Sequence, residues 1–185
     1  MKAYLSNIVD EINKPLFAGV PRKKLIGIAE PIIITDKGKA RTMPTYIDND
    51  GNAFYVGPDD DFDILLYHKC NGITVRSAAV SYGDENFIVN TARMSMIVFG
   101  RRDTLRMRSD EAAVYMQSVI PDKATTPVYM ATNITVTDIV LATQQVFNGE
   151  FSGFDFFVKP EQFLFRLNYN IESTFSKACF NTCID

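Results

Sequence analysis

Six aspartates between residues 48 and 63, in DNDGNAFYVGPDDDFD, form the densest set of side chains in the chain that could do chemistry. Carboxylates this close together can bind Ca²⁺ or act as an acid and a base. The stretch begins like a calcium loop, but the positions that need glycine and glutamate hold Ala53 and Asp59. Because Asp48–Asn52 lies between two apolar β-like segments, the pattern predicts an exposed hairpin turn.

A second acidic turn follows, with Asp59, Asp60 and Asp61 directly after Gly57-Pro58. Like charges at such short range favour exposure to solvent. Catalysis by a pair of these carboxylates would need surroundings that separate their two pKa values and a pocket for substrate. We therefore expect a charged rim, and a small enzyme that uses Asp59–Asp63 is kept as an alternative.

A basic segment, RRDTLRMR, follows the apolar strand-like residues 94–99. It holds four arginines and one acid, namely Arg101, Arg102, Arg106 and Arg108 with Asp103. Such a patch attracts DNA phosphates, although no nucleic-acid-binding motif accompanies it. It also suits head-to-tail self-association, in which the basic segment of one subunit faces the acidic segment of the next. These arginines and Asp59–Asp61 are therefore our candidate subunit or DNA-channel contacts.

Zinc and cofactor chemistry have little support. His68 and Cys70 could share a strand face, and Cys179 and Cys183 could share a helical turn. H-x-C and C-x₃-C are not the usual tight chelating pairs, so we expect no metal site. No nucleophile elbow, phosphate loop or dinucleotide fingerprint occurs. We predict no catalytic residue and no cofactor, with a His68–Cys70 pocket as a second form of the enzyme alternative.

Composition places the chain among ordinary globular proteins. Its 185 residues are 46% hydrophobic and 22% charged, with a net charge of -3, so we expect one domain spanning residues 1–185. Asp10 and Glu11 interrupt the first apolar stretch where a signal peptide would be continuous, and no segment is long enough to span a bilayer. With three cysteines, an odd number, we expect synthesis in a reducing cytoplasm and no membrane partner.

Helical periodicity occurs in three places. Leu5, Ile8, Val9 and Ile12 predict a helix over 2–14 that ends at Pro15. Ser109 is a typical N-cap, and it predicts a second helix that ends before Pro121. Thr137-Asp138 predicts the start of a third helix, which Gly149 ends.

The remaining apolar segments are typical of strands. They cover residues 25–29, 31–35, 43–47, 53–56, 63–69, 73–79 and 87–99, with Pro31 indicating an edge or a bulge. Residues 163–172 alternate, with Phe163, Phe165, Leu167, Tyr169 and Ile171 on one face and Leu164, Arg166, Asn168, Asn170 and Glu172 on the other. The predicted fold is α+β: a mostly antiparallel β-sheet flanked by about three helices in a single domain, with an acidic hairpin region at 43–63.

The order of these elements carries a family resemblance. It consists of a first helix, a β-rich middle, a strand followed by GRR, the helix SDEAAVYMQSVIP, a further helix, and the late strand FLFRLNYNIE running into a Cys-containing tail. This order is similar to that of tail-terminator and head-to-tail connector proteins of tailed bacteriophages. The resemblance implies a structural subunit of the phage virion, made in the host cytoplasm, that forms a ring around the DNA channel. Its partners would be copies of itself, neighbouring connector or tail proteins, and DNA contacted non-specifically. The acidic region 43–63 departs from this pattern.

A third class of function depends on four phenylalanines, Phe151, Phe154, Phe156 and Phe157. If they were exposed together, they would suit a module that binds a ligand or a cell surface. We expect them to lie in the core instead, because large aromatic side chains are usually buried.

Overall fold

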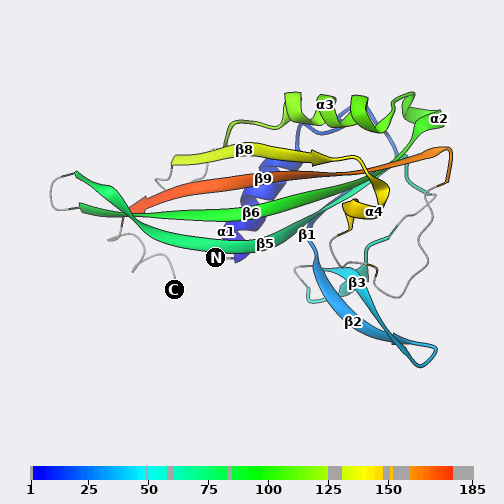
Figure 1. Cartoon of the computed structure of the whole chain (residues 1–185), viewed down its shortest axis with the longest axis horizontal. Coiled ribbons are helices and arrows are strands. Elements are labelled where there is room, and N and C mark those ends of the chain that lie inside the picture. Colours follow the sequence, from blue (N-terminus) through cyan, green and yellow to red (C-terminus); the bar gives the residue numbers. More distant parts are fainter. Residues whose placement is uncertain are drawn as a thin grey trace.

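The computed structural model describes residues 2–48, 50–57, 61–82, 85–124, 131–147, 151 and 159–176. These residues form an α+β fold dominated by antiparallel strands, which confirms the predicted class. Within them lie a six-stranded main sheet, in the order β1-β5-β6-β9-β8-β7, and a three-stranded sheet, in the order β2-β3-β4 (Figure 1).

The strands of the main sheet are β1 (Lys23–Ile28), β5 (Ile64–Tyr82), β6 (Glu85–Arg101), β7 (Lys123–Ala124), β8 (Ala131–Val140) and β9 (Gln162–Ser176). The small sheet consists of β2 (Glu30–Asp36), β3 (Lys39–Ile47) and β4 (Ala53–Tyr55). The helices are α1 (Lys2–Asn13), α2 (Arg102–Leu105), α3 (Ser109–Val119) and α4 (Thr143–Val146). None of these described helices is both long and apolar enough to cross a membrane.

One face of the main sheet packs against α1 and α3. The alternation predicted in β9 is confirmed, because its five apolar residues from Phe163 to Ile171 are buried in one cluster with Ile8, Ile12 and Met116 of the helices. Burial of such side chains is worth about 1.5–3 kcal/mol each. This cluster therefore supplies the main stabilisation of the sheet.

Among the described residues, the opposite face is covered near the end where β5 begins. There Tyr67, Ile97 and Leu164 pack with Val146 of α4 and with Phe151 in a second buried cluster. Leu164 is thus buried although its strand neighbours on that face are polar. Beyond this cluster the face turns polar.

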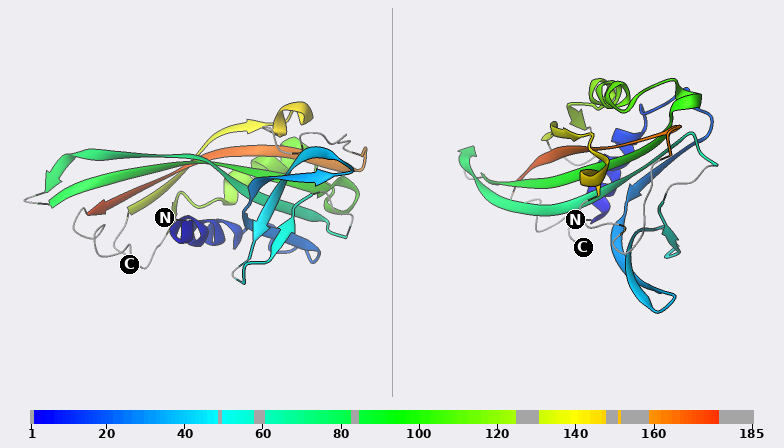
Figure 2. Two further views of the ribbon diagram at one scale, coloured as in Figure 1. Left: turned by 90° about the horizontal axis from the view of Figure 1, so that it is seen from below. Right: turned by 45° about the vertical axis from the view of Figure 1, so that its right-hand side comes forward.

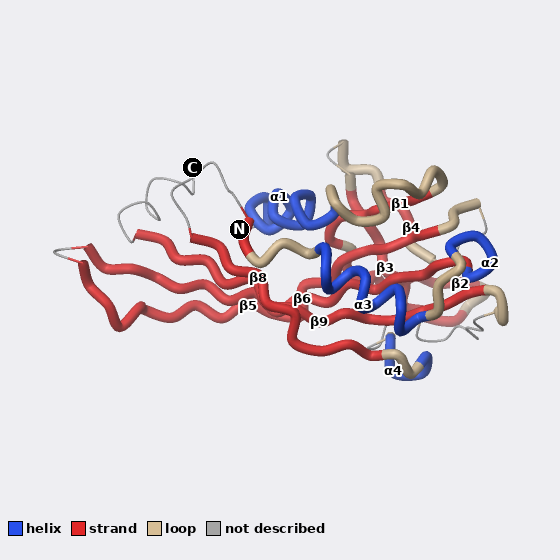
Figure 3. Tube along the Cα trace, turned by 90° about the horizontal axis from the view of Figure 1, so that it is seen from above, coloured by secondary structure: helices blue, strands red, loops and turns tan. Residues whose placement is uncertain are grey.

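Strands β5 and β6 form a hairpin that extends beyond α1 (Figure 3). Its register shifts between Cys70 and Gly72, where Gly72 has φ 151, a conformation that favours glycine. An extra residue in a strand reverses which side chains face the core. The shift therefore returns Ile73 and Val75 to the helix-bearing face, although no described helix covers them and both are exposed.

The small sheet points away from the main sheet, as Figure 1 and the right-hand view of Figure 2 show. It forms part of the connection between β1 and β5, which are parallel neighbours. Of the edge or bulge predicted from Pro31, the edge is confirmed, since among the described strands β2 pairs only with β3. The predicted hairpin is also confirmed, because Ile47 pairs with Ala53 across the turn.

The helix predicted from Thr137 is wrong. Residues 131–140 form β8, paired with β9, and the only helix described beyond it is the four-residue α4. Ile139 and Val140 fit a helical period, but β-branched side chains also favour strands, and pairing with the long β9 decides between the two. Gly149, the predicted end of the helix, lies outside the described residues.

The start of α3 differs by one residue from the prediction. Arg108, not Ser109, is the N-cap, and its backbone N–H donates to the Glu111 carboxylate over 2.8 Å. The helix ends at Val119, as expected from Pro121, because a residue before proline is disfavoured in helical conformation.

Candidate interaction site at the charged end of the main sheet

The acidic and basic segments meet at one end of the main sheet. Strand β5 begins at Ile64 and its antiparallel neighbour β6 ends at Arg101, so the residues just outside both strands lie side by side. The Arg101 backbone N–H donates to the Asp63 carbonyl oxygen over 2.9 Å. The sequence offers no signal for this proximity, because the two segments are separated by the whole β5–β6 hairpin.

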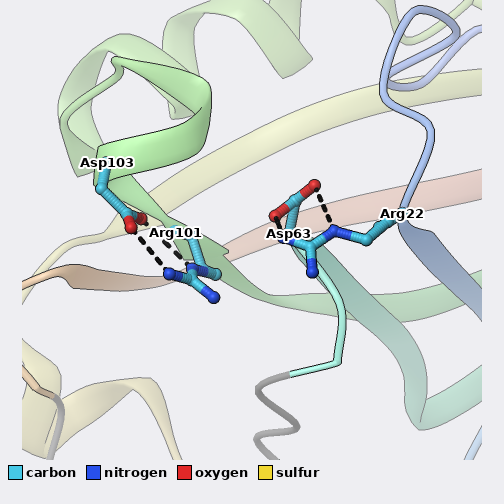
Figure 4. Close-up of polar contacts among 4 residues, drawn as sticks. All are labelled: Arg22, Asp63, Arg101 and Asp103. Atoms are coloured by element: carbon cyan, nitrogen blue, oxygen red, sulfur yellow. Dashed lines mark hydrogen bonds and ion pairs between the residues drawn. The ribbon is translucent and has the colours of Figure 1, made fainter.

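Asp63 is a buried structural residue, which corrects its assignment to the exposed rim. Its side chain is 2% exposed, and its oxygens accept hydrogen bonds from Arg22 Nε at 3.1 Å and Nη2 at 2.5 Å (Figure 4). The Asp63 backbone N–H also donates to the Arg22 carbonyl over 2.7 Å. This two-pronged pair fixes the chain before β1 against the start of β5. The sequence alone does not identify Arg22 as the partner of Asp63, because the two residues are 41 positions apart.

Only part of the predicted rim can be located. Asp59 and Asp60 lie outside the described residues, and Asp61 is exposed. The two described carboxylates considered for acid–base chemistry therefore differ in exposure to solvent. Asp63 is buried and paired with Arg22, whereas Asp61 is exposed.

Arg101 is paired within its own segment. Its Nε and Nη2 donate to the two Asp103 oxygens at 3.2 and 2.7 Å, as Figure 4 shows. This hydrogen bonding from Arg101 holds the pKa of the Asp103 carboxyl below its usual value. The single acid of the basic segment therefore neutralises one of its arginines.

The other arginines of the segment fall into two groups. Arg108 lies at the start of α3, where its Nη2 contacts the Asp110 carboxylate at 2.9 Å and its Nε lies 3.7 Å from Glu111. Arg102 and Arg106 are exposed and make no ion pair with any described residue. Arg106 has φ 53 at the end of α2, which turns the chain toward α3. Arg102 and Arg106 are thus the charges that remain for an outside partner.

His68 has no exposed ring nitrogen for catalysis or metal binding. Its Nδ1 lies 2.7 Å from Tyr169 Oη and its Nε2 lies 3.0 Å from Asn13 Oδ1. Because Asn13 Nδ2 donates to the Ile26 carbonyl, its Oδ1 accepts from His68, and His68 Nδ1 accepts from Tyr169. Burial lowers the pKa of His68 to about 3 and raises that of Tyr169, to which nearby Cys70 also contributes.

The metal-ligand candidates are not brought together in the described part of the chain. There, no group of three or more histidine, cysteine, aspartate or glutamate residues could hold an ion. Cys70 is half-buried, and Cys179 and Cys183 lie outside the described residues. In the acidic hairpin, the Asp48 carboxylate stabilises the turn itself, since it accepts hydrogen bonds from the backbone N–H groups of Asp50 and Asn52. The Asn52 side chain, followed by these backbone groups, lowers the Asp48 pKa.

The phenylalanine patch can be tested at one position. Phe151 is buried, and its ring lies 4.7 Å from that of Phe147 in an edge-to-face arrangement. This agrees with the expected core position. Phe154, Phe156 and Phe157 lie outside the described residues.

No protein-family model matches the sequence, and no curated protein matches it with significance.

Proposed function

We propose that the chain is a structural subunit of a phage virion, forming an oligomeric ring at the head-tail connector or the tail terminator around the DNA channel. The order of elements supports this except at the further helix, where the chain forms strand β8 instead. The α+β fold agrees with what the resemblance implies. The observation that carries the proposal is the projecting small sheet, which exposes apolar side chains that a subunit contact would bury.

The small sheet exposes large apolar side chains on both faces. Ile33, Phe54 and Tyr55 are 72%, 50% and 58% exposed, and Ile47 is exposed beside them. Phe54 pairs with Tyr46 and Tyr55 pairs with Thr45, so the two aromatic side chains of β4 point to opposite faces. Several large apolar side chains exposed on one small sheet are typical of protein contacts. A ribbon that is apolar on both sides suits insertion between two surfaces of neighbouring subunits.

The charged end contributes a second part of the proposed contact. Arg102 and Arg106 offer positive charge beside the half-buried apolar side chains of Leu105 and Met107. Asp48 and Asp50 carry negative charge at the turn of the β3–β4 hairpin. Apolar groups accompanied by opposite charges favour a head-to-tail contact, in which the hairpin of one subunit meets the α2 region of the next.

The test is the mass of the purified chain in solution, measured by light scattering at low and high salt with negative-stain images of the same fractions. We expect a closed ring that weakens as salt screens the charges. A compact monomer at every concentration and salt would reject the proposal.

A matched pair of variants locates the contact. Phe54→Ser combined with Tyr55→Ser should yield folded monomers, because two exposed apolar anchors are removed while the core is untouched. Val114→Ser on α3 removes a side chain that is 64% exposed and lies away from the small sheet, so it should assemble like the unaltered chain. Equal effects of both changes would argue against the small sheet as the contact.

A further inference from the structure

A polar groove of about 330 Å³ lies on the main sheet and crosses strands β5, β6, β9 and β8. Met94 and Met96 belong to the cluster under α1 and α3, so by alternation Arg93 and Ser95 point to the opposite face. The groove is thus on the polar face opposite α1 and α3, where no described helix lies over it, away from both the charged end and the small sheet.

Two β-bulges border this groove at the same level of the sheet. One lies in β5 between Cys70 and Gly72, and the other in β8 between Val136 and Asp138. The paired row that joins them runs through Cys70, Met94, Tyr169 and Val136. The extra residues, Asn71 and Thr137, both line the groove. Bulges bend strands and redirect side chains, and they are frequent beside functional sites.

The floor of the groove is a fixed chain of polar side chains. Asn71 Nδ2 donates to Ser95 Oγ at 2.8 Å, and Ser95 Oγ donates to Asn168 Oδ1 at 2.6 Å. Asn168 Nδ2 in turn donates to Asp138 Oδ2 at 3.3 Å. These bonds cross four strands and hold the amides in set orientations, so the floor is pre-organised before any ligand arrives.

Two guanidinium groups line the groove. Arg93 is exposed and has no hydrogen-bond or ion-pair partner among the described residues. Its Nη2 lies over Gly72, where an added Cβ would be only 3.1 Å away, so the glycine makes room for it. Arg166 donates from Nη1 to the Val146 carbonyl at 3.0 Å, while its buried Nε meets no acceptor in the described part.

We propose that this groove binds a small polar ligand that carries an oxyanion, either a phosphate or a carboxylate. Guanidinium groups match the paired oxygens of such anions, and a buried N–H without an acceptor is costly until a partner arrives. Asn170 lies beside Arg93 in the β6–β9 pairing and adds an amide for ligand hydroxyls. Binding of an oxyanion in this groove does not require the chain to form a ring.

The test is a titration followed by ¹H–¹⁵N NMR, including the arginine Nε–H signals, with inorganic phosphate and separately with glucuronate at constant ionic strength. We expect saturable shifts at Arg93 and Arg166 with at least one of them. Saturation by phosphate alone assigns a phosphorylated ligand, and saturation by glucuronate alone assigns a carboxylate.

Two arginine variants distinguish specific binding in the groove from non-specific attraction of anions to positive charge. Arg93→Gln should weaken binding about tenfold or more, because a charged hydrogen bond is lost. Arg76→Gln removes an exposed arginine of the same sheet that pairs with Glu172 outside the groove, and it should bind normally. Asn170→Ala provides a second groove variant if Arg93→Gln fails to fold. Shifts that never saturate, or equal weakening by Arg93→Gln and Arg76→Gln, would overturn the proposal.

Discussion

Three buried polar residues join three elements of the protein. Tyr169 of β9, His68 of β5 and Asn13 of α1 form one chain of hydrogen bonds, which continues to the Ile26 carbonyl of β1. Each group has its donor or acceptor satisfied, so this chain adds specificity to a core that is otherwise apolar. It requires a neutral His68, because a protonated Nδ1 could not accept from Tyr169.

The stability of the fold should therefore fall in mild acid. The pKa of His68 is lowered from 6.5 to about 3 by burial, so below pH 6.5 the unfolded chain takes up a proton that the folded chain does not. The contribution of His68 to the free energy of unfolding is fully present above pH 6.5. It declines toward pH 3, by up to about 1.4 kcal/mol per pH unit. Urea unfolding at a series of pH values measures this slope.

The control is His68→Gln, which removes the only histidine in the chain. Between pH 6.5 and the range in which carboxylates titrate, its unfolding free energy should be nearly flat, whatever its absolute stability. If the variant and the unaltered chain lost stability in parallel, the slope would not come from His68.

Long-range partners limited what the sequence could predict at this scale. The basic segment was visible from composition, but the burial of Asp63 was not, since its partner Arg22 is 41 positions away. Arg166 and Asn168 were predicted on one polar face of β9. Arg93 joins them only through the register of β6 against β9.

At the scale of elements, the β6–β9 pairing depends on a close contact between Gly100 and Phe163. The two residues pair across the strands, and the Phe163 ring lies over Gly100, where an added Cβ would overlap it. An aromatic ring covering a strand glycine packs well only while the side-chain position stays empty.

Gly100→Ala should destabilise the fold by about 1–3 kcal/mol, since the ring must leave its place in the core. Gly19→Ala is the matched control, because nothing lies within 4 Å of the added Cβ. Thermal or urea unfolding compares them. Equal stability of the two variants would show that Phe163 can move at little cost.

For some elements, the spacing of apolar residues was sufficient to predict the secondary structure. The helices α1 and α3 and the strand β9 were predicted because each has one apolar face and clear end signals. β8 was missed because Ile139, Val140 and Val146 fit a helical period, whereas the strand is selected by its pairing with β9. The bulge in β8 further obscures the strand alternation, since it shifts the side-chain phase after Val136.

At the scale of the whole molecule, charge is concentrated at one end of the main sheet and much of it is already paired. Arg22, Arg101 and Arg108 each have a carboxylate partner within the chain. Attraction between subunits at this end would therefore depend on Arg102 and Arg106, which have no carboxylate partner among the described residues.

Reversing one of these charges should weaken the proposed ring. Arg102→Glu should lower the assembled mass at low salt, because repulsion replaces attraction at the contact. Arg76→Glu changes the net charge equally at an exposed site in the distal part of the sheet, and it should assemble normally. Light scattering compares the two variants, and identical assembly by both would exclude the α2 region from the contact.

The small sheet occupies the connection between two parallel neighbours, β1 and β5. Because Lys23 pairs with Ile64 and Ile28 with His68, a chain leaving β1 must travel back the length of that strand before β5 can begin. A six-residue strand is about 17 Å long, so any replacement must span roughly that distance. Within that limit the connection is replaceable: a different loop grafted there would change the exposed surface of this region while the strand order of the main sheet stays the same.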